Sequence, residues 1–186
     1  MTSKKILVIV SLLFLALGFN GCITTQSKQY DITFNGKGGG KAVIKYYNIM
    51  GDAEAAKDDF KSLISDYYMG SSIEDEFPNA TILSKELYQE GEVLSGTVEI
   101  EFKDVKDLKL FQYDSNSPIM MYVNSMNETY VESNGTYDEN VMPVVFWSKD
   151  TKTISLKTNV AGEIAPDDTS KVSMLAPWKE WKAKMK

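Results

Sequence analysis

The stretch Val93-Leu-Ser-Gly-Thr-Val-Glu-Ile-Glu-Phe102 decides the fold class. Apolar and polar side chains alternate along it, which is typical of an antiparallel strand with one buried face and one face in water. The inward set is Leu94, Val98, Ile100 and Phe102, and the outward set is Ser95, Thr97, Glu99 and Glu101. The alternation also explains the outward carboxylates without any catalytic role.

Hairpins and a helix are predicted around this strand. Residues 80–88 form its partner strand across a short turn, and residues 30–34 and 41–49 alternate around a glycine-rich turn. Between the two hairpins, apolar residues recur at helical spacing over 56–68, with Asp52 as the N-cap candidate. The order is therefore ββαββ, with the helix covering one face of the sheet.

The second half of the chain predicts more strands. Asp104 caps an expected short helix over 104–111, and turns rich in Asn, Gly, Ser and Asp separate four further strands. These strands are expected at 118–123, 128–133, 142–147 and 151–158. We expect an α+β fold: an antiparallel sheet of hairpins, ββαββ followed by a short helix and a four-strand meander, with helices on one face.

The N-terminal segment points to a location. Lys4 and Lys5 precede the apolar run 6–17, and Gly21 stands directly before Cys22, the only cysteine. A basic region followed by a short apolar run is typical of a secretory signal, and the run is too short to span a bilayer. The segment is either a specialised signal that ends at Cys22, or an ordinary signal peptide or a buried N-terminal helix whose cysteine is incidental.

The segment resembles the lipobox of bacterial lipoprotein precursors. That resemblance implies that 1–21 is a signal peptide and that Cys22 is acylated and anchors the chain in the membrane, on the periplasmic or cell-surface side. In the Gram-negative pattern, an aspartate after the cysteine favours the inner membrane. Ile23 stands there instead, which indicates the outer membrane in such a host. Residues 22–29, small and polar, are expected to form a tether, and 30–160 a single domain.

Composition limits the chemistry. The 186 residues carry a formal net charge of −6, or −8 once Lys4 and Lys5 are removed with the signal, and include no histidine and no arginine. Without histidine there is no Ser-His-Asp or Cys-His system and no imidazole ligand. An acidic, arginine-free chain suits nucleic acid poorly, because phosphates supply most of that affinity. We expect no enzyme activity, no metal or cofactor and no nucleic-acid partner.

Two groups of residues are candidate contact sites. Tyr67 and Tyr68 end the apolar stripe of the predicted helix and are candidates to line a cleft, although aromatic residues at this spacing also form cores. The segment 161–186 is expected to be an acidic linker followed by an amphipathic end rich in Trp and Lys. Its candidate contacts with a membrane surface or partner are Trp178, Trp181, Lys179 and Lys182, the alternative being that both tryptophans pack on the domain.

The ββαββ start, with the run Gly-Thr-Val-Glu-Ile-Glu-Phe-Lys-Asp-Val-Lys-Asp-Leu at 96–108, is similar to the LppM-like lipoprotein domain. That family combines an antiparallel sheet with helices and is associated with lipid-linked envelope glycans. We expect an envelope lipoprotein with a non-catalytic binding or scaffold role for a lipid, glycan or protein partner. The alternatives are a hydrolase using Asp/Glu or Ser/Lys chemistry, and a structural surface protein with no small ligand.

Overall fold

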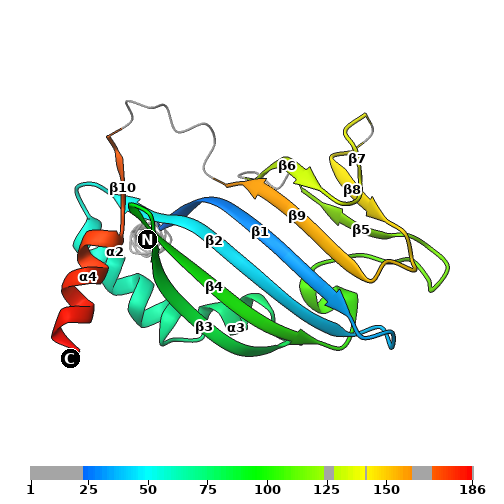
Figure 1. Cartoon of the computed structure of the whole chain (residues 1–186), viewed down its shortest axis with the longest axis horizontal. Helices are drawn as coiled ribbons and strands as arrows, with labels where there is room; N and C mark the ends of the chain where they lie inside the picture. The colour runs from blue at the N-terminus through cyan, green and yellow to red at the C-terminus, as the bar shows by residue number, and fades with distance from the viewer. Residues whose placement is uncertain (1–22, 124–127, 141, 161–168, 186) are drawn as a thin grey trace, which may run out of the picture.

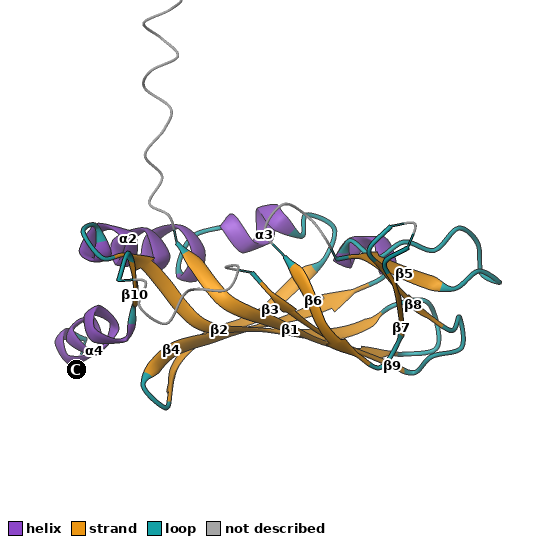
Figure 2. Cartoon of the chain, turned by 90° about the horizontal axis from the view of Figure 1, so that it is seen from above, coloured by secondary structure: helices purple, strands orange, loops and turns teal. Residues whose placement is uncertain are grey.

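The computed structural model describes residues 23–123, 128–140, 142–160 and 169–185. They form a mostly antiparallel, curved sheet with helices, which confirms the α+β fold class (Figure 1). The signal segment and Cys22 lie outside the described residues, as do 161–168 of the expected linker. Figure 2 shows that helices α2 and α3 lie on the same side of the sheet, which we call its covered face.

The first hairpin is longer than its alternation indicated. Strands β1 (Thr24–Phe34) and β2 (Gly40–Asp52) pair antiparallel, beginning at Thr24 opposite Met50. The predicted tether over 22–29 is therefore wrong from Thr24 onward. Small polar residues enter the strand there because their hydroxyls are satisfied by the backbone: Oγ1 of buried Thr25 donates to the carbonyl of Tyr47 at 2.6 Å.

The second hairpin, β3 (Thr81–Glu90) and β4 (Val93–Phe102), is confirmed. The main sheet has the order β3-β4-β2-β1-β9-β6, and the short strand β10 (Lys171–Ser173) also pairs with β2. Leu94 and Ile100 are fully buried, as the alternation predicted. Ser95 was predicted to face water but is also fully buried. The hydroxyl of Ser173 in β10 accepts a hydrogen bond from the backbone N–H of the neighbouring residue, Leu94.

The four-strand meander is wrong, although all four strands exist. They are β5 (Ile119–Tyr122), β6 (Thr129–Ser133), β8 (Val144–Trp147) and β9 (Thr153–Asn159), with β7 (Thr136–Asp138) in addition. Strand β9 lies between β1 and β6, whereas β5, β8 and β7 form a separate three-stranded sheet. Turn spacing predicts where strands end but not which strands pair. The position of β9 in the main sheet follows from the burial of one of its faces.

The helical region begins later than predicted. The α-helix α2 (Ala56–Ser62) continues into a π-helical turn, η1 (Leu63–Tyr68), and α3 (Ser72–Glu76) follows where a loop was expected. Asp52 is not the N-cap, because it ends β2 and its carboxylate binds Lys171. The 3₁₀ turn η2 (Val105–Leu108) is capped by Asp104 as predicted, in a reciprocal capping box with Asp107.

The C-terminal residues belong to the domain. After β10, helix α4 (Leu175–Lys184) contacts α2 and β4 at one end of the sheet. The domain therefore extends at both ends beyond the predicted 30–160. Two clusters of buried side chains fill it: a large one between the covered face, α3, η2 and the small sheet, and a smaller one joining α2, η1 and α4.

Candidate functional site

A cavity of about 290 Å³ lies between the covered face of the sheet and the helical region. Its floor contains a row of cross-strand neighbours, which we call the polar row. The polar row consists of Thr158 of β9, Lys28 of β1, Tyr46 of β2, Gly96 of β4 and Leu87 of β3. All but Thr158 line the cavity. Because they sit on consecutive strands of one sheet, the backbone ladder fixes their spacing.

The helical region supplies the roof. Tyr67 and Tyr68 come from the π-helical turn η1, and Ile73 and Glu76 come from α3. A π-helical turn inserts one extra residue per turn and is frequent at functional sites. Here it carries both tyrosines that the sequence indicated as cleft candidates. Both line the cavity: Tyr67 is 41% exposed, and Tyr68 is half-buried with its ring edge-on to Trp181 at 6.2 Å.

The start of the described chain forms part of the cavity wall. Ile23 and Thr24 line the cavity together with Val160, the residue that follows β9. Val160 is held there because its N–H donates to the carbonyl of Gln26 at 3.1 Å. The cavity therefore lies directly beside the point where the chain enters the domain.

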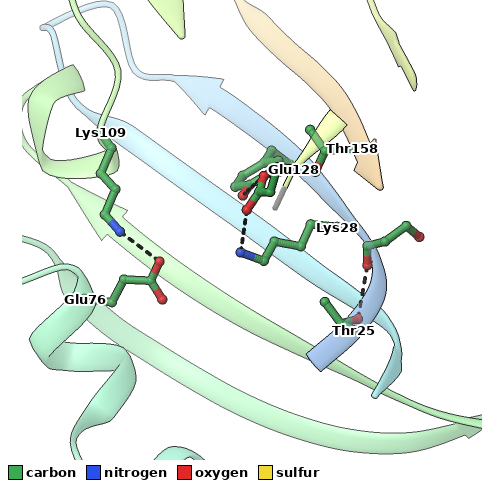
Figure 3. A network of polar contacts seen from close by, with 8 residues as sticks. Thr25, Lys28, Glu76, Lys109, Glu128 and Thr158 are labelled. Atoms are coloured by element: carbon green, nitrogen blue, oxygen red, sulfur yellow. Dashed lines mark hydrogen bonds and ion pairs between the residues drawn. The ribbon is translucent and has the colours of Figure 1, made fainter. Parts of the chain in front are cut away.

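Glu128 organises the polar side of the site (Figure 3). Its Oε1 pairs with Lys28 Nζ at 2.7 Å, and its Oε2 accepts hydrogen bonds from Thr158 Oγ1 at 3.1 Å and Tyr30 OH at 3.4 Å. The side chains of Lys28 and Glu128 are only 18% and 15% exposed. Such a pair is retained at low exposure because each charge neutralises the other and the remaining oxygen is hydrogen-bonded.

Most other charges near the cavity are also paired, and the exception in the lining, Glu86, is exposed. Glu76 Oε1 binds Lys109 Nζ at 2.8 Å (Figure 3). Lys85 Nζ binds both oxygens of Glu74, at 3.0 and 3.1 Å, and the carbonyl of Gly70 at 2.7 Å. The hydrogen bond from Lys85 holds the pKa of Glu74 below its ordinary value. These contacts leave the charged side chains around the cavity nearly balanced in sign.

Two phenols at the site are kept neutral. Burial raises the pKa of Tyr30 well above its ordinary value, and the carboxylate of Glu128 raises it further. Burial likewise raises the pKa of Tyr46, with smaller contributions from Glu76 and Glu128. The Tyr46 ring lies 5.7 Å from Lys28 Nζ, and its hydroxyl makes no hydrogen bond to any residue that the structure describes. Tyr46 therefore brings an uncommitted neutral hydroxyl to the cavity.

The C-terminal candidates do not meet the cavity. Trp178, predicted as a surface contact, is buried with 6% exposure in the cluster that joins α2, η1 and α4, and Trp181 is half-buried against Phe60. The alternative, that both tryptophans pack on the domain, is the correct one. Lys179 and Lys182 are exposed, and Lys182 Nζ lies 4.5 Å from the Trp178 ring. The two tryptophan rings pack on the domain because α4 places both of them against apolar side chains of α2 and η1.

Sequence reasoning missed Lys28, Tyr46, Glu76 and Glu128. One signal was available: Lys28 shares strand parity with Tyr30 and Ile32, so extending the strand by two residues would have placed a lysine on the inward face. A lysine at an inward position needs a partner, and that requirement indicates a buried polar site. Nothing in the sequence indicated Glu128 as that partner, because the pairing depends on β9 inserting between β1 and β6.

Several other features bear on function. No serine lines the cavity among the described residues, and they contain no group of three or more Cys, Asp or Glu side chains placed to hold a metal ion. In the same part of the chain, no helix is long and apolar enough to cross a membrane. Comparisons of the chain with protein-family models, with curated proteins and with solved structures find no match.

Proposed function

We propose that this protein is a lipid-anchored lipoprotein of the cell envelope, with a non-catalytic binding role, that holds an apolar or amphipathic small molecule in the cavity. The observation that carries the proposal is the cavity itself, formed by the polar row below and by η1 and α3 above. Its volume of about 290 Å³ lies just below the usual range for ligand sites, roughly 300–1,000 Å³.

The lining supports binding rather than catalysis. Apolar and aromatic residues make up more than half of it, with threonines and charged side chains between them, and a largely apolar lining with a few placed polar groups is usual for a small-molecule site. A hydrolase would need a serine beside a lysine or a free pair of carboxylates. The described lining contains no serine, and of its carboxylates Glu76 already binds Lys109 while Glu86 is exposed. The hydrolase alternative therefore has no specific observation in its favour.

The anchor supports the location. An acylated Cys22 would attach the protein stably, since acyl chains contribute about 0.8 kcal/mol per buried methylene. Intact mass spectrometry of protein purified from its host membrane tests this: we expect a chain that begins at Cys22 and carries acyl groups. A Cys22→Ser variant should lack that mass, and an unmodified wild-type chain would contradict the anchor.

Photolabelling of the full chain in phosphatidylcholine nanodiscs tests the binding role. A dodecane carrying a diazirine should label peptides that line the cavity. Leu87→Trp places an indole on the cavity floor and should reduce that labelling at least about tenfold, whereas Leu83→Trp alters an exposed residue of the same strand outside the lining and should leave it unchanged. Equal labelling of both variants, each shown to be folded, would contradict the proposal.

A further inference from the structure

The charges around the cavity restrict what it can hold. Lys28 is neutralised by Glu128, Lys85 by Glu74, and Glu76 by Lys109. A buried carboxylate or phosphate without an unpaired cation is strongly unfavourable, and the same holds for a buried amine without an unpaired carboxylate. The remaining charged residue of the lining, Glu86, is exposed. The cavity therefore favours a ligand without net charge.

The Tyr46 hydroxyl adds one directional requirement. It lies on the cavity floor and makes no hydrogen bond within the part of the chain that is described. Tyr46 is half-buried and its hydroxyl is open to water, so a ligand acceptor at this point can take the place of that water. Because the lysines around the cavity are already paired, no free cation stabilises a negative ligand atom here, and the suitable acceptor is neutral, such as a carbonyl oxygen.

The volume and the position of the cavity limit the apolar part of the ligand. At roughly 30 Å³ for each group of the size of a water molecule, the cavity holds about ten such groups, enough for one acyl chain of about that many carbons. The chain would lie among Leu63, Leu87 and Val98. The wall formed by Ile23 and Thr24 sets this space beside the start of the domain, where an anchored protein meets the bilayer.

We infer that the cavity accommodates one acyl chain of a neutral ester, whose carbonyl oxygen accepts a hydrogen bond from the Tyr46 hydroxyl. This inference rests on the proposed binding function and specifies its ligand class. Two sources supply the same chemistry: a monoacyl ester of the surrounding membrane, and the ester-linked acyl groups carried by Cys22 itself. A lipid that buries two chains in the cavity does not fit.

Competition against the diazirine-dodecane probe tests the inference in the full chain. Monododecanoylglycerol should compete at least about tenfold better than dodecanoate or dodecylammonium, because it alone buries no charge. Tyr46→Phe should weaken the ester by about three- to tenfold, the usual effect of one neutral hydrogen bond, and leave the probe unaffected. The control Tyr122→Phe alters a half-exposed phenol of β5 and should change nothing.

The outcomes separate the inference from the proposed function. Absence of probe labelling in the cavity would overturn both. Normal labelling with no preference for the ester, or with Tyr46→Phe equal to the wild type, would overturn the inference alone. The Cys22→Ser variant separates the two sources. If this variant binds the ester and the acylated protein does not, the chain's own acyl group occupies the cavity. If both proteins bind the ester equally, the ligand is an ester of the membrane.

Discussion

Two rows of residues on the same strands behave in opposite ways. The polar row runs from Thr158 to Leu87, as defined above. A second row lies four residues away from the polar row along each of β1, β2 and β4, and we call it the apolar row. It consists of Ile154, Ile32, Ala42, Ile100 and Ile82. The apolar row belongs to the large buried cluster, and Ala42 and Ile100 in it are fully buried. The polar row instead forms the floor of a cavity and contains a paired lysine.

The difference shows how one sheet serves two purposes. At the apolar row, side chains from η2 and the small sheet complete the packing. At the polar row, the π-helical turn and α3 leave space, and the chain pairs its charges internally while the Tyr46 hydroxyl makes no hydrogen bond to a described residue. Because both rows share strands, the packed row holds the cavity floor rigid, which is what a selective site requires.

Breaking the polar row at Glu128 should have the largest effect. Glu128→Leu leaves Lys28 charged and mostly buried without its partner, and we expect a loss of about 3–5 kcal/mol in the free energy of unfolding, measured with urea. Replacing both partners, Lys28→Met with Glu128→Leu, should recover most of that loss. A single variant that loses less than about 1 kcal/mol would show that the pair is well solvated.

Truncating one side chain in each row should show how differently the two rows are packed. Ile100→Ala in the apolar row creates a void in a filled core, at an expected cost of about 2–5 kcal/mol. Leu87→Ala in the polar row enlarges a space that already exists beside a half-buried side chain, and its cost should stay below about 2 kcal/mol. Urea denaturation of both variants measures the difference, and equal costs would contradict a hollow floor.

Alkaline pH should act on Tyr46 of the polar row and on Tyr30, two residues along β1 from Lys28. The folded-state pKa values of Tyr30 and Tyr46 are raised, so their contribution to stability is complete below the ordinary tyrosine pKa of about 10 and is lost as the pH rises above it. Each group should remove up to about 1.4 kcal/mol per pH unit there. Tyr46→Phe should flatten this decline, measured by urea denaturation between about pH 9 and 11. An unchanged slope would indicate an exposed phenol.

The smallest effect is expected for an ion pair on the opposite face. Lys41 and Glu99 contact at 3.4 Å with side chains 58% and 40% exposed. Lys41→Met should change the free energy of unfolding by less than about 1 kcal/mol, since solvent screens such pairs. High salt should remove even that difference, in contrast to the Lys28 pair. A larger loss would mean that the open face is less solvated than its exposure indicates.

The sequence predicted the local elements well. Alternation and turn residues located both hairpins and four further strands, and the carboxylate and spacing at Asp104 predicted its cap. Helical periodicity located the region of α2 and η1 and placed Tyr67 and Tyr68 on the side that proves to line the cavity. These features depend on neighbours within a few residues along the chain.

What could not be predicted depends on distant partners. The insertion of β9 beside β1 and the pairing of β10 with β2 join segments more than a hundred residues apart. The tether was misjudged because Thr25 and Ser27 are small and polar, and only their pairing with β2 shows that they are buried. The same limit hid Glu128, whose partners come from β1 and β9.

The central position of β1 has a consequence for how the chain folds. Ser27 pairs with Tyr47 on one side and with Asn159 on the other. Strand β1 therefore cannot pair on both edges until β9 has been synthesised and has reached it. Closing so long a loop is entropically costly, and topologies rich in such contacts fold in milliseconds to seconds rather than microseconds. During that interval β1 presents an unpaired edge, which makes the newly made chain a substrate for chaperones and proteases.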